Sequence, residues 1–285
     1  MIHYSPLRYP GGKGRLSGYF KQIYEANSLC GGGYVEPYAG GASVALSLLI
    51  DGYASKVIIN DIDLSIYAFW YSVINKTEEL CRLINDTPLN VETWNLQRRI
   101  QKERDKHNLL EIGFSTFFLN RSNRSGILDA GIIGGKRQSG GWKIDERFNK
   151  NELISRIQRI SQYRDKIELH NLDAMKLIEQ IIDELPKKTF IYFDPPYFMK
   201  GKELYLNFYG IDDHTAVANR INKINLQKWV VTYDRVSFIE RLYSRYRQVK
   251  YTLNYSASKA RKGEELMVFS DNLKIPDLSP ISNRN

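Results

Sequence analysis

Apolar and polar positions alternate along this chain in the manner of an α/β protein. Short runs rich in β-branched and aromatic residues predict strands, and stretches with helical spacing lie between most of them, which is typical of a mainly parallel sheet. Seven strands are expected, at Tyr34–Tyr38, Lys56–Asp61, Lys166–Asn171, Thr189–Asp194, Trp229–Asp234, Arg247–Asn254 and Glu265–Ser270. The intervening helices are expected at Ala42–Asp51, Leu64–Ile74, Ala174–Leu185 and Asp213–Ile224.

The last two predicted strands are joined differently from the others. Only Tyr255–Glu264 connects them, which is too short for a helical crossover. We therefore expect an antiparallel hairpin at an edge of the sheet.

A helical insertion is predicted in the middle of the chain, because the strand signal disappears from about Lys76 to Arg164. This divides the chain into a first part (1–75), a helical insertion (76–164) and a second part (165–285). Within the insertion, the glycine-rich segment Arg121–Gly141 is too long for a simple connector, and loops of that length are usually functional or mobile. The helical patterns cover Thr77–Asp86, Val91–Arg104, Leu109–Leu119 and Asn151–Tyr163.

Charge and composition narrow the class of protein. The 285 residues include 41 Lys and Arg against 32 Asp and Glu, a formal net charge of +9 that favours a polyanionic partner, nucleic acid before an anionic membrane surface. Two cysteines are too few for a disulfide scaffold, and no signal peptide or run of about 18 apolar residues is present. The four histidines have no ligand spacing, so no metal site is expected. A cytoplasmic protein without membrane contact fits best.

A glycine turn, Glu36-Pro37-Tyr38-Ala39-Gly40-Gly41-Ala42-Ser43, leads from the first predicted strand into an apolar helix. An α/β sheet binds nucleotide-like ligands at this position, because glycine lets the backbone approach them closely. Asp61 follows Gly40 by 21 residues, near the spacing of about 20 expected for an acid that binds ribose hydroxyls. The full G-x-G-x-x-G phosphate motif is absent, so a cofactor with ribose and no pyrophosphate, such as S-adenosylmethionine, fits both features. The alternative is a tight turn followed by a helix-capping Asp.

The fourth predicted strand delivers Asp194-Pro195-Pro196-Tyr197 to the carboxyl edge of the sheet. The prolines stop the strand and offer no amide hydrogen, so nearby carbonyls lack internal partners. The Asp194 carboxylate and the Pro195 carbonyl can each accept one N–H of a planar exocyclic amine and free its lone pair to attack a sulfonium methyl. Tyr197 offers a ring on which a base lifted from its duplex can stack. A bare strand-terminating turn is the alternative.

Taken in order, these motifs resemble those of the Dam-type class of DNA adenine methylases over nearly the whole chain. Leu7-Arg8-Tyr9-Pro10-Gly11-Gly12-Lys13 is similar to the opening cofactor motif, and Phe118-Leu119-Asn120-Arg121 to the start of the DNA-reading segment. The resemblance implies a seven-stranded Rossmann-like methyltransferase sheet, S-adenosylmethionine as methyl donor and adenine in DNA as acceptor. It also implies cofactor contacts by residues of the shared motifs: Tyr9, Gly12, Lys13, Glu36, Pro37, Tyr38, Gly40, Asp61 and Asp194.

The chain departs from that family at three places. Tyr9 replaces a Trp and Ala42 replaces a glycine, both mild changes that should preserve cofactor binding. Ser122–Ile127 differs from the segment of members that read GATC, so GATC recognition is not implied. Asp173, after the third predicted strand, either holds the adenine amino group of the cofactor or caps the following helix.

Two basic segments are candidates for DNA contacts. Arg241–Gly263 holds seven basic residues, four tyrosines and no acid, which suits phosphate contacts with some stacking, although a solvated basic face is the alternative. The glycine-rich loop carries several basic residues, and guanidinium groups commonly read guanine, although Arg121 could instead anchor the loop. The predicted DNA contacts are Arg121, Asn123, Arg124, Lys136, Lys259, Arg261 and Lys262.

The sequence therefore predicts a DNA methyltransferase that acts on the N6 amine of a flipped adenine in double-stranded DNA. Alternatives are an amino-methyltransferase on cytosine N4, RNA or a protein amide, and a DNA-binding regulator that has lost catalysis. Intact Asp61 and Asp194 argue against the regulator. The target site, the oligomeric state and a cognate restriction endonuclease that shares the target stay open.

Overall fold

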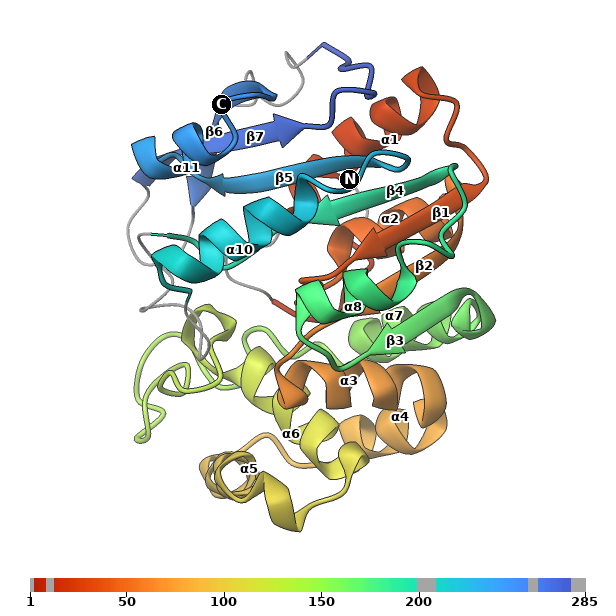
Figure 1. The fold of residues 1–285 in the computed structure, drawn as a ribbon. Coiled ribbons are helices and arrows are strands. Elements are labelled where there is room, and N and C mark those ends of the chain that lie inside the picture. The colour runs from red at the N-terminus through yellow and green to blue at the C-terminus, as the bar shows by residue number, and fades with distance from the viewer. Residues whose placement is uncertain (1–2, 9–12, 199–208, 256–260, 278–285) are drawn as a thin grey trace.

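One mixed sheet organises the chain (Figure 1). The computed structural model describes residues 3–8, 13–198, 209–255 and 261–277. Within them the strands lie in the order β3-β2-β1-β4-β5-β7-β6, and β7 is antiparallel to both of its neighbours. The strands are β1 (Gly32–Glu36), β2 (Ala54–Asn60), β3 (Ile167–His170), β4 (Thr189–Phe193), β5 (Lys228–Asp234), β6 (Arg247–Tyr255) and β7 (Arg261–Phe269). The predicted seven-stranded sheet and its edge hairpin are confirmed.

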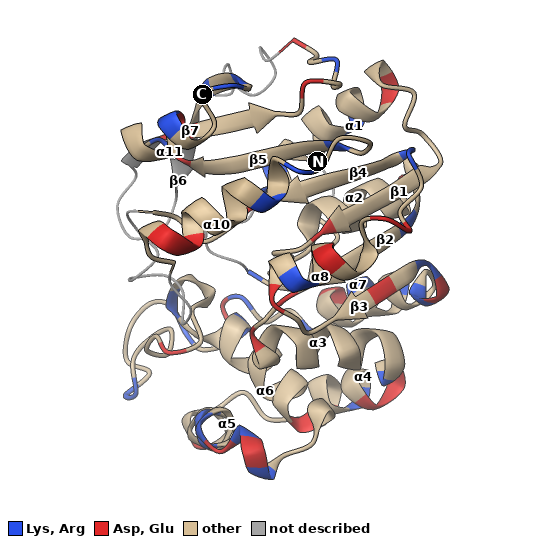
Figure 2. Cartoon of the chain, viewed as in Figure 1, with Lys and Arg blue, Asp and Glu red and all other residues tan. Residues whose placement is uncertain are grey.

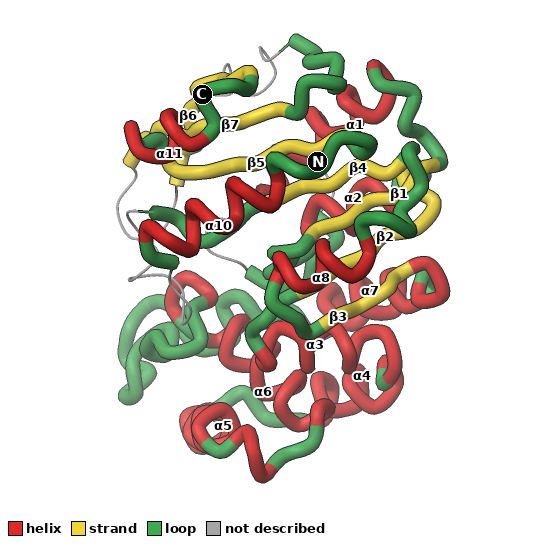
Figure 3. Tube along the Cα trace, in the orientation of Figure 1, coloured by secondary structure: helices red, strands yellow, loops and turns green. Residues whose placement is uncertain are grey.

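The helices fall into two groups, seen as red segments in Figure 3. Those that accompany the sheet are α1 (Ser17–Ala26), α2 (Ser43–Ile50), α3 (Leu64–Asn75), α8 (Ala174–Ile181), α10 (Ile211–Ile221) and α11 (Ser237–Leu242). Those within the predicted insertion are α4 (Thr77–Asp86), α5 (Val91–Lys102), α6 (Leu109–Ser122) and α7 (Lys150–Ser161). The sequence analysis missed α1 and α11.

The pleat of the strands gives the sheet two apolar faces, because successive side chains point to opposite sides. Val35 and Ile191 belong to one buried cluster, together with apolar residues of α8, α10 and α11. Their neighbours Tyr34 and Phe190 belong to the other, which α1 and α2 cover. The near-continuous apolar runs of the central strands reflect burial on both faces, which leaves the carboxyl ends of the strands as the edge open to a ligand.

The predicted insertion packs against α3 and extends the apolar cluster of the α1–α2 side rather than forming a core of its own. At Gly113 in α6, an added Cβ would lie 2.4 Å from the Ala68 carbonyl oxygen of α3, so the two helices approach at backbone distance. Asn108 starts α6 with a reciprocal capping box to Glu111. The glycine-rich segment lies between α6 and α7.

Two searches of the described residues found no further feature. No helix among them has the length and apolar content needed to cross a bilayer. In the same part of the chain, no group of three or more His, Cys, Asp and Glu side chains is arranged to hold a metal ion.

Candidate active site

The glycine turn after β1 is held by the carboxylate that ends β2. Gly40 N–H donates to Asp61 Oδ2 at 2.9 Å, and Asp63 N–H donates to Asp61 Oδ1 at 2.9 Å. Trp70 Nε1 donates to the Gly40 carbonyl at 2.8 Å and fixes the turn from α3. The N-cap of α3 is Asp63. Asp61 is therefore not the helix cap that the sequence left as an alternative.

Burial raises the pKa of Asp61 to about 7, although both backbone N–H groups oppose the shift by stabilising the carboxylate. Next to it, the Ile62 side chain is 51% exposed, an unusual position for a large apolar group. An apolar face beside a carboxylate at the end of a strand suits the adenosine part of a cofactor. Ile62 was missed by the sequence analysis; the signal was an apolar residue directly after a strand-ending acid.

Three neighbouring strand ends are tied together by Asn60, which is 1% exposed. Its Nδ2 donates to the carbonyl oxygens of Pro37 at 2.8 Å and Leu172 at 2.9 Å, and its Oδ1 accepts from Leu172 N–H at 2.9 Å. Asp173 follows directly, and its Oδ1 accepts from Met175 and Lys176 N–H at the start of α8. The capping role of Asp173 is confirmed, and its role toward the cofactor remains a prediction.

The catalytic motif begins where β4 ends. Asp194 Oδ1 accepts a hydrogen bond from Thr232 Oγ1 at 2.6 Å and lies 3.3 Å from Lys13 Nζ. The Asp194 side chain keeps 20% of its surface exposed, so the ion pair does not seal it. Burial raises the pKa of Asp194, while Lys13 and Thr232 oppose that shift. Because its pKa is raised overall, Asp194 is a better proton acceptor than an exposed Asp.

Lys13 is shared between two acids. Its Nζ lies 3.3 Å from Glu265 Oε2 as well as from Asp194, and it also donates to Tyr197 OH. Tyr197 OH and Tyr251 OH each donate to Glu265 at 2.7 Å. Burial alone would lower the pKa of Lys13, but Asp194 and Glu265 raise it well above the ordinary value, so Lys13 carries its charge.

Tyr197 has a different environment from the one that base stacking suggests. It is 2% exposed, and Lys13 Nζ lies 4.6 Å from its ring centroid. One face of the ring is therefore already covered by a cation. Any base that stacks on Tyr197 has to meet the other face.

Glu36 and Tyr38 frame the same region. Glu36 is 4% exposed, and its Oε2 accepts from Ala45 N–H at 3.3 Å at the start of α2. Burial, and then the charge of Asp194, raise its pKa well above the ordinary value. Tyr38 OH lies 3.4 Å from Tyr209 OH. Glu36 is thus a neighbour of Asp194 through the interior.

The residues predicted to contact DNA separate into two kinds. Arg124 and Lys136 are exposed on the loop between α6 and α7, where Figure 2 shows Lys and Arg. Arg121 is half-buried, and its Nε donates to the Arg147 carbonyl at 2.6 Å, the anchoring role that the sequence left open. Asn123 is fully buried.

The side-chain amide of Asn123 is used within the chain. Its Oδ1 accepts from Trp94 Nε1 at 2.6 Å, and its Nδ2 donates to the carbonyls of Ile127 and Leu128. The expected DNA contact by Asn123 is therefore corrected to a loop-forming role. Arg261 and Lys262 lie at the start of β7, while Tyr9, Gly12 and Lys259 fall outside the described residues.

Comparison with known proteins identifies the family of the chain. A family model of the D12 class N6 adenine-specific DNA methyltransferases matches residues 9–256. The chain belongs to this family. The resemblance inferred from the motifs is confirmed.

The similar solved structures share little sequence with this chain. One similar structure is that of the S-adenosylmethionine-dependent methyltransferase from Agrobacterium tumefaciens, with a TM-score of 0.43 and 8% sequence identity. The match covers 90% of this chain and 62% of that protein. The rRNA methyltransferase AviRa from Streptomyces viridochromogenes matches with a TM-score of 0.40 and 13% identity over 93% of this chain and 87% of its own. A search of curated proteins found no significant match.

For a D12 class methyltransferase, the described site brings together most of the predicted residues. Gly40 and Asp61 meet at one strand end, and Lys13 reaches Asp194 from the N-terminal segment. Glu265 is a second residue of the candidate site that the sequence analysis missed. The sequence feature that could have identified it is the acid itself, which stands on the same face of β7 as the buried apolar residues Met267 and Phe269.

Proposed function

We propose that this D12 class enzyme transfers a methyl group from S-adenosylmethionine to the N6 amine of an adenine that has been turned out of double-stranded DNA. The observation that carries the proposal is the position of Asp194 at the carboxyl end of β4, partly exposed and fixed through one oxygen. Both of its side-chain contacts fall on Oδ1, and among the described residues no hydrogen bond involves Oδ2. Oδ2 is therefore the oxygen that accepts an N–H from the base.

Asp194 and the Pro195 carbonyl accept the two N–H groups of the amine, which directs its lone pair away from the aromatic ring. The bound cofactor supplies an electrophilic methyl carbon on a sulfonium. Methylation of the amine would require the loss of one N–H proton, and the carboxylate of Asp194, which accepts a hydrogen bond from that N–H, would take it up. Its raised pKa suits it to this transfer.

Lys13 and Glu265 set the charge around Asp194. If Asp194 alone faced Lys13, the ammonium would hold its carboxylate more tightly and weaken it as an acceptor. Glu265 shares the ammonium at the same distance, 3.3 Å, and is itself fixed by Tyr197 and Tyr251. Glu265 is therefore a positioning residue for the catalytic acid.

The cofactor would occupy the edge formed by the turn at Gly40, the carboxylate of Asp61 and the exposed side chain of Ile62. Asp61 would accept hydrogen bonds from the ribose hydroxyls, Ile62 would contact the adenine ring, and Asp173 would accept a hydrogen bond from the adenine amino group. We assign the remaining predicted contacts, Tyr9, Gly12, Glu36, Pro37 and Tyr38, to the same binding edge from their motifs.

Residues 76–164 form the target-recognition insertion in this proposal, between catalytic parts 1–75 and 165–285. The exposed Arg124 and Lys136 contact DNA from the loop after α6. The hairpin of β6 and β7 carries the second group of contacts, Lys259, Arg261 and Lys262. Two basic segments on separate parts of the chain suit a duplex that lies across the site.

Methyl transfer from labelled S-adenosylmethionine to four acceptors tests the proposal: duplex DNA, single-stranded DNA, RNA and protein. We expect label in N6-methyladenine of duplex DNA, identified by mass spectrometry of the nucleosides. Label in N4-methylcytosine, RNA or protein would support the amino-methyltransferase alternatives. No transfer to any acceptor, together with tight DNA binding, would support the regulator.

A further inference from the structure

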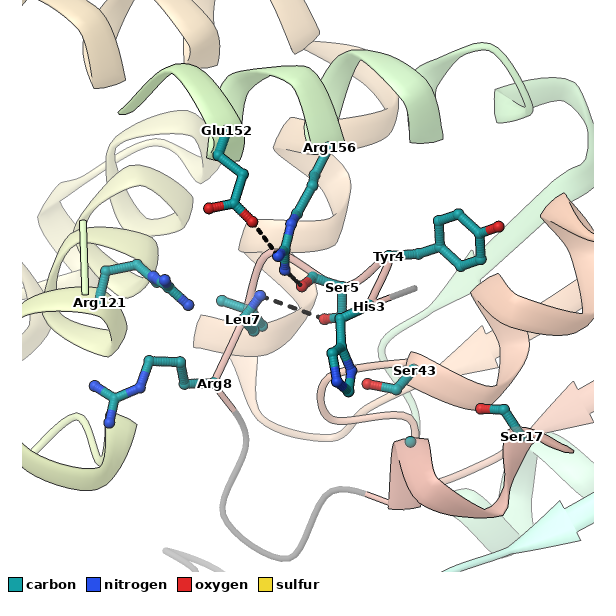
Figure 4. A pocket seen from close by; sticks show the side chains of 11 residues that line it. His3, Tyr4, Ser5, Leu7, Arg8, Ser17, Ser43, Arg121, Glu152 and Arg156 are labelled. Carbon is teal, nitrogen blue, oxygen red and sulfur yellow. Dashed lines mark hydrogen bonds and ion pairs between the residues drawn. The ribbon is translucent and has the colours of Figure 1, made fainter. Parts of the chain in front are cut away.

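A cavity of about 240 Å³ lies beside the cofactor turn, between the N-terminal segment, the start of α2 and the helix α7 (Figure 4). Arg8, Arg121 and Arg156 line it together with the single acid Glu152. Ser43, the first residue of α2, lines the opposite side. No part of the proposed methyl transfer uses these arginines together.

The arginines are poorly neutralised. Arg156 is paired with Glu152 and also donates to the Ser5 carbonyl at 3.0 Å. Arg8 donates through Nη1 to the Asn123 carbonyl at 3.1 Å, and Arg121 donates through Nε to the Arg147 carbonyl. Within the described residues, no carboxylate lies within ion-pair distance of Arg8 or Arg121. Three guanidinium groups therefore share one acid.

Such a cluster is unfavourable without an anion. Burial, and then repulsion from Arg8 and Arg156, lower the pKa of Arg121 to about 10, so it is still charged at neutral pH. A bound oxyanion would relieve this repulsion and accept hydrogen bonds from several guanidinium N–H groups at once. The start of α2 at Ser43 adds the positive end of a helix dipole.

The surroundings identify the source of the anion. Arg8 also lines a second cavity of about 700 Å³, in which three arginines, Arg8, Arg124 and Arg147, outnumber two acids, Asp129 and Glu146. Asn120 fixes the backbone of Arg8, which lines both cavities: its Oδ1 accepts from Arg8 N–H at 2.7 Å and its Nδ2 donates to the carbonyls of Arg8 and Gly126, both at 2.9 Å. A polymer with regularly spaced phosphates suits two arginine-lined cavities that share Arg8.

We propose that the cavity lined by Arg8, Arg121 and Arg156 binds one phosphodiester group of the DNA. This inference rests on the proposed function for its source of phosphate. It adds Arg8 and Arg156 to the DNA interface and places a fixed contact next to the turn that binds the cofactor. The position of the duplex would thereby be set relative to the methyl donor.

The double variant Arg8→Gln/Arg156→Gln tests the site. Fluorescence anisotropy measures its affinity for a duplex at several salt concentrations, and one lost phosphate contact shallows the slope of log affinity against log salt by about 0.9. We expect that change, with affinity at low salt about fivefold to tenfold weaker and affinity for S-adenosylhomocysteine unchanged. The control is Arg82→Gln/Arg99→Gln, which removes the same charge at two exposed arginines outside the cavity.

A slope that stays at the wild-type value, or falls equally in the control, would overturn the proposal. So would weaker S-adenosylhomocysteine binding at an unchanged slope, which would assign the cavity to the carboxylate of the cofactor. Inorganic phosphate that raises the melting temperature of the wild type and not of the variant, again at an unchanged slope, would indicate a site for free phosphate only. If the Gln variant does not fold, Arg8→Lys/Arg156→Lys keeps the charge, and its duplex affinity is expected to fall at an unchanged slope; wild-type affinity would contradict the site.

Failure of the proposed function gives a different result. In that case the wild type methylates RNA or protein and not DNA, whatever the variants do. Failure of the phosphate site leaves DNA methylation by the wild type intact and shows only in the comparison of the two double variants.

Discussion

The ammonium of Lys13 lies 3.3 Å from Asp194 Oδ1, which joins the N-terminal segment to the end of β4. The same ammonium lies 3.3 Å from Glu265 Oε2 of β7. One buried cation thus connects the opening motif, the catalytic motif and the antiparallel edge of the sheet. The basicity of Asp194 depends on all three.

Replacement of Glu265 by Gln is expected to slow catalysis without weakening ligand binding. The amide that replaces the carboxylate would still form hydrogen bonds with the two tyrosines, but Lys13 would pair with Asp194 alone. We expect kcat to fall about tenfold or more, with KM for DNA and affinity for S-adenosylhomocysteine unchanged. The negative charge of Glu265 also raises the pKa of Asp194, so the acidic limb of the pH–rate profile should move to lower pH.

The matched control is Glu264→Gln on the same strand, whose acid is exposed and paired with Arg235. It should retain the activity and the pH profile of the wild type. A Glu265→Gln enzyme with unchanged kcat and pH profile would show that Glu265 has no positioning role.

Cofactor affinity should depend on pH through Asp61. Its carboxyl has a pKa of about 7 in the folded protein, and it must be ionised to accept ribose hydroxyls. Affinity for S-adenosylhomocysteine, measured by calorimetry, should therefore rise with pH up to about 7 and then level off, with a slope of at most about tenfold per pH unit. Asp61→Asn should bind more weakly and without this dependence. A wild-type affinity that is flat from pH 5.5 to 8 would contradict the role of Asp61.

The same shift has the opposite effect on folding. A carboxyl whose folded pKa is raised favours the folded state below its unfolded pKa, and this contribution is lost as pH rises through about 7. Asp61→Asn should thus gain stability relative to the wild type as pH rises from 6 to 8. Denaturant unfolding of both proteins at several pH values measures this difference. If Asp61→Asn instead gained stability relative to the wild type as pH fell, the prediction would be contradicted.

The contact between α3 and α6 should be sensitive to a single methyl group. At Gly113 an added Cβ meets the Ala68 carbonyl oxygen at 2.4 Å, which is backbone and cannot rotate away. Gly113→Ala should lower the free energy of unfolding by about 1–3 kcal/mol. Gly141→Ala, which meets nothing within 4 Å, should change it by less than about 0.5 kcal/mol. Equal stability of the two variants would show that the helices separate readily.

The strands could be predicted because the central ones are apolar on both faces and end in acids or turn residues. The start of the chain was harder. α1 begins after Leu16, which provides no side-chain cap, and its Ser-Gly start lacks the usual signal of a helix. α11 has only six residues, too few to show a helical period.

At the site, motifs identified the positions but not the contacts. The spacing of Gly40 and Asp61 predicted their proximity, whereas the link between Lys13, Glu265 and Tyr197 depends on long-range packing that no local pattern encodes. Asn123 was assigned to DNA because polar loop residues are usually exposed. The indole N–H of Trp94 and two carbonyls keep it inside instead.

The basic start of β7 should contribute to DNA affinity through charge. Replacement of Arg261 and Lys262 by Ala should shallow the slope of log affinity against log salt by up to about 1.8 if each contacts one phosphate. Anisotropy titrations of a duplex measure the slope, and methylation at saturating DNA should persist. An unaltered slope would show that this segment is a solvated basic face that does not contact DNA.

The most direct test of the account is methylation by Asp194→Ala, because the account assigns the activation of the amine to that carboxylate. With labelled S-adenosylmethionine and duplex DNA, we expect no detectable N6-methyladenine, while affinities for DNA and S-adenosylhomocysteine stay close to those of the wild type. Asp183→Ala, which changes an exposed acid in the turn between α8 and β4, should methylate normally. Undiminished turnover by Asp194→Ala would contradict the proposed chemistry.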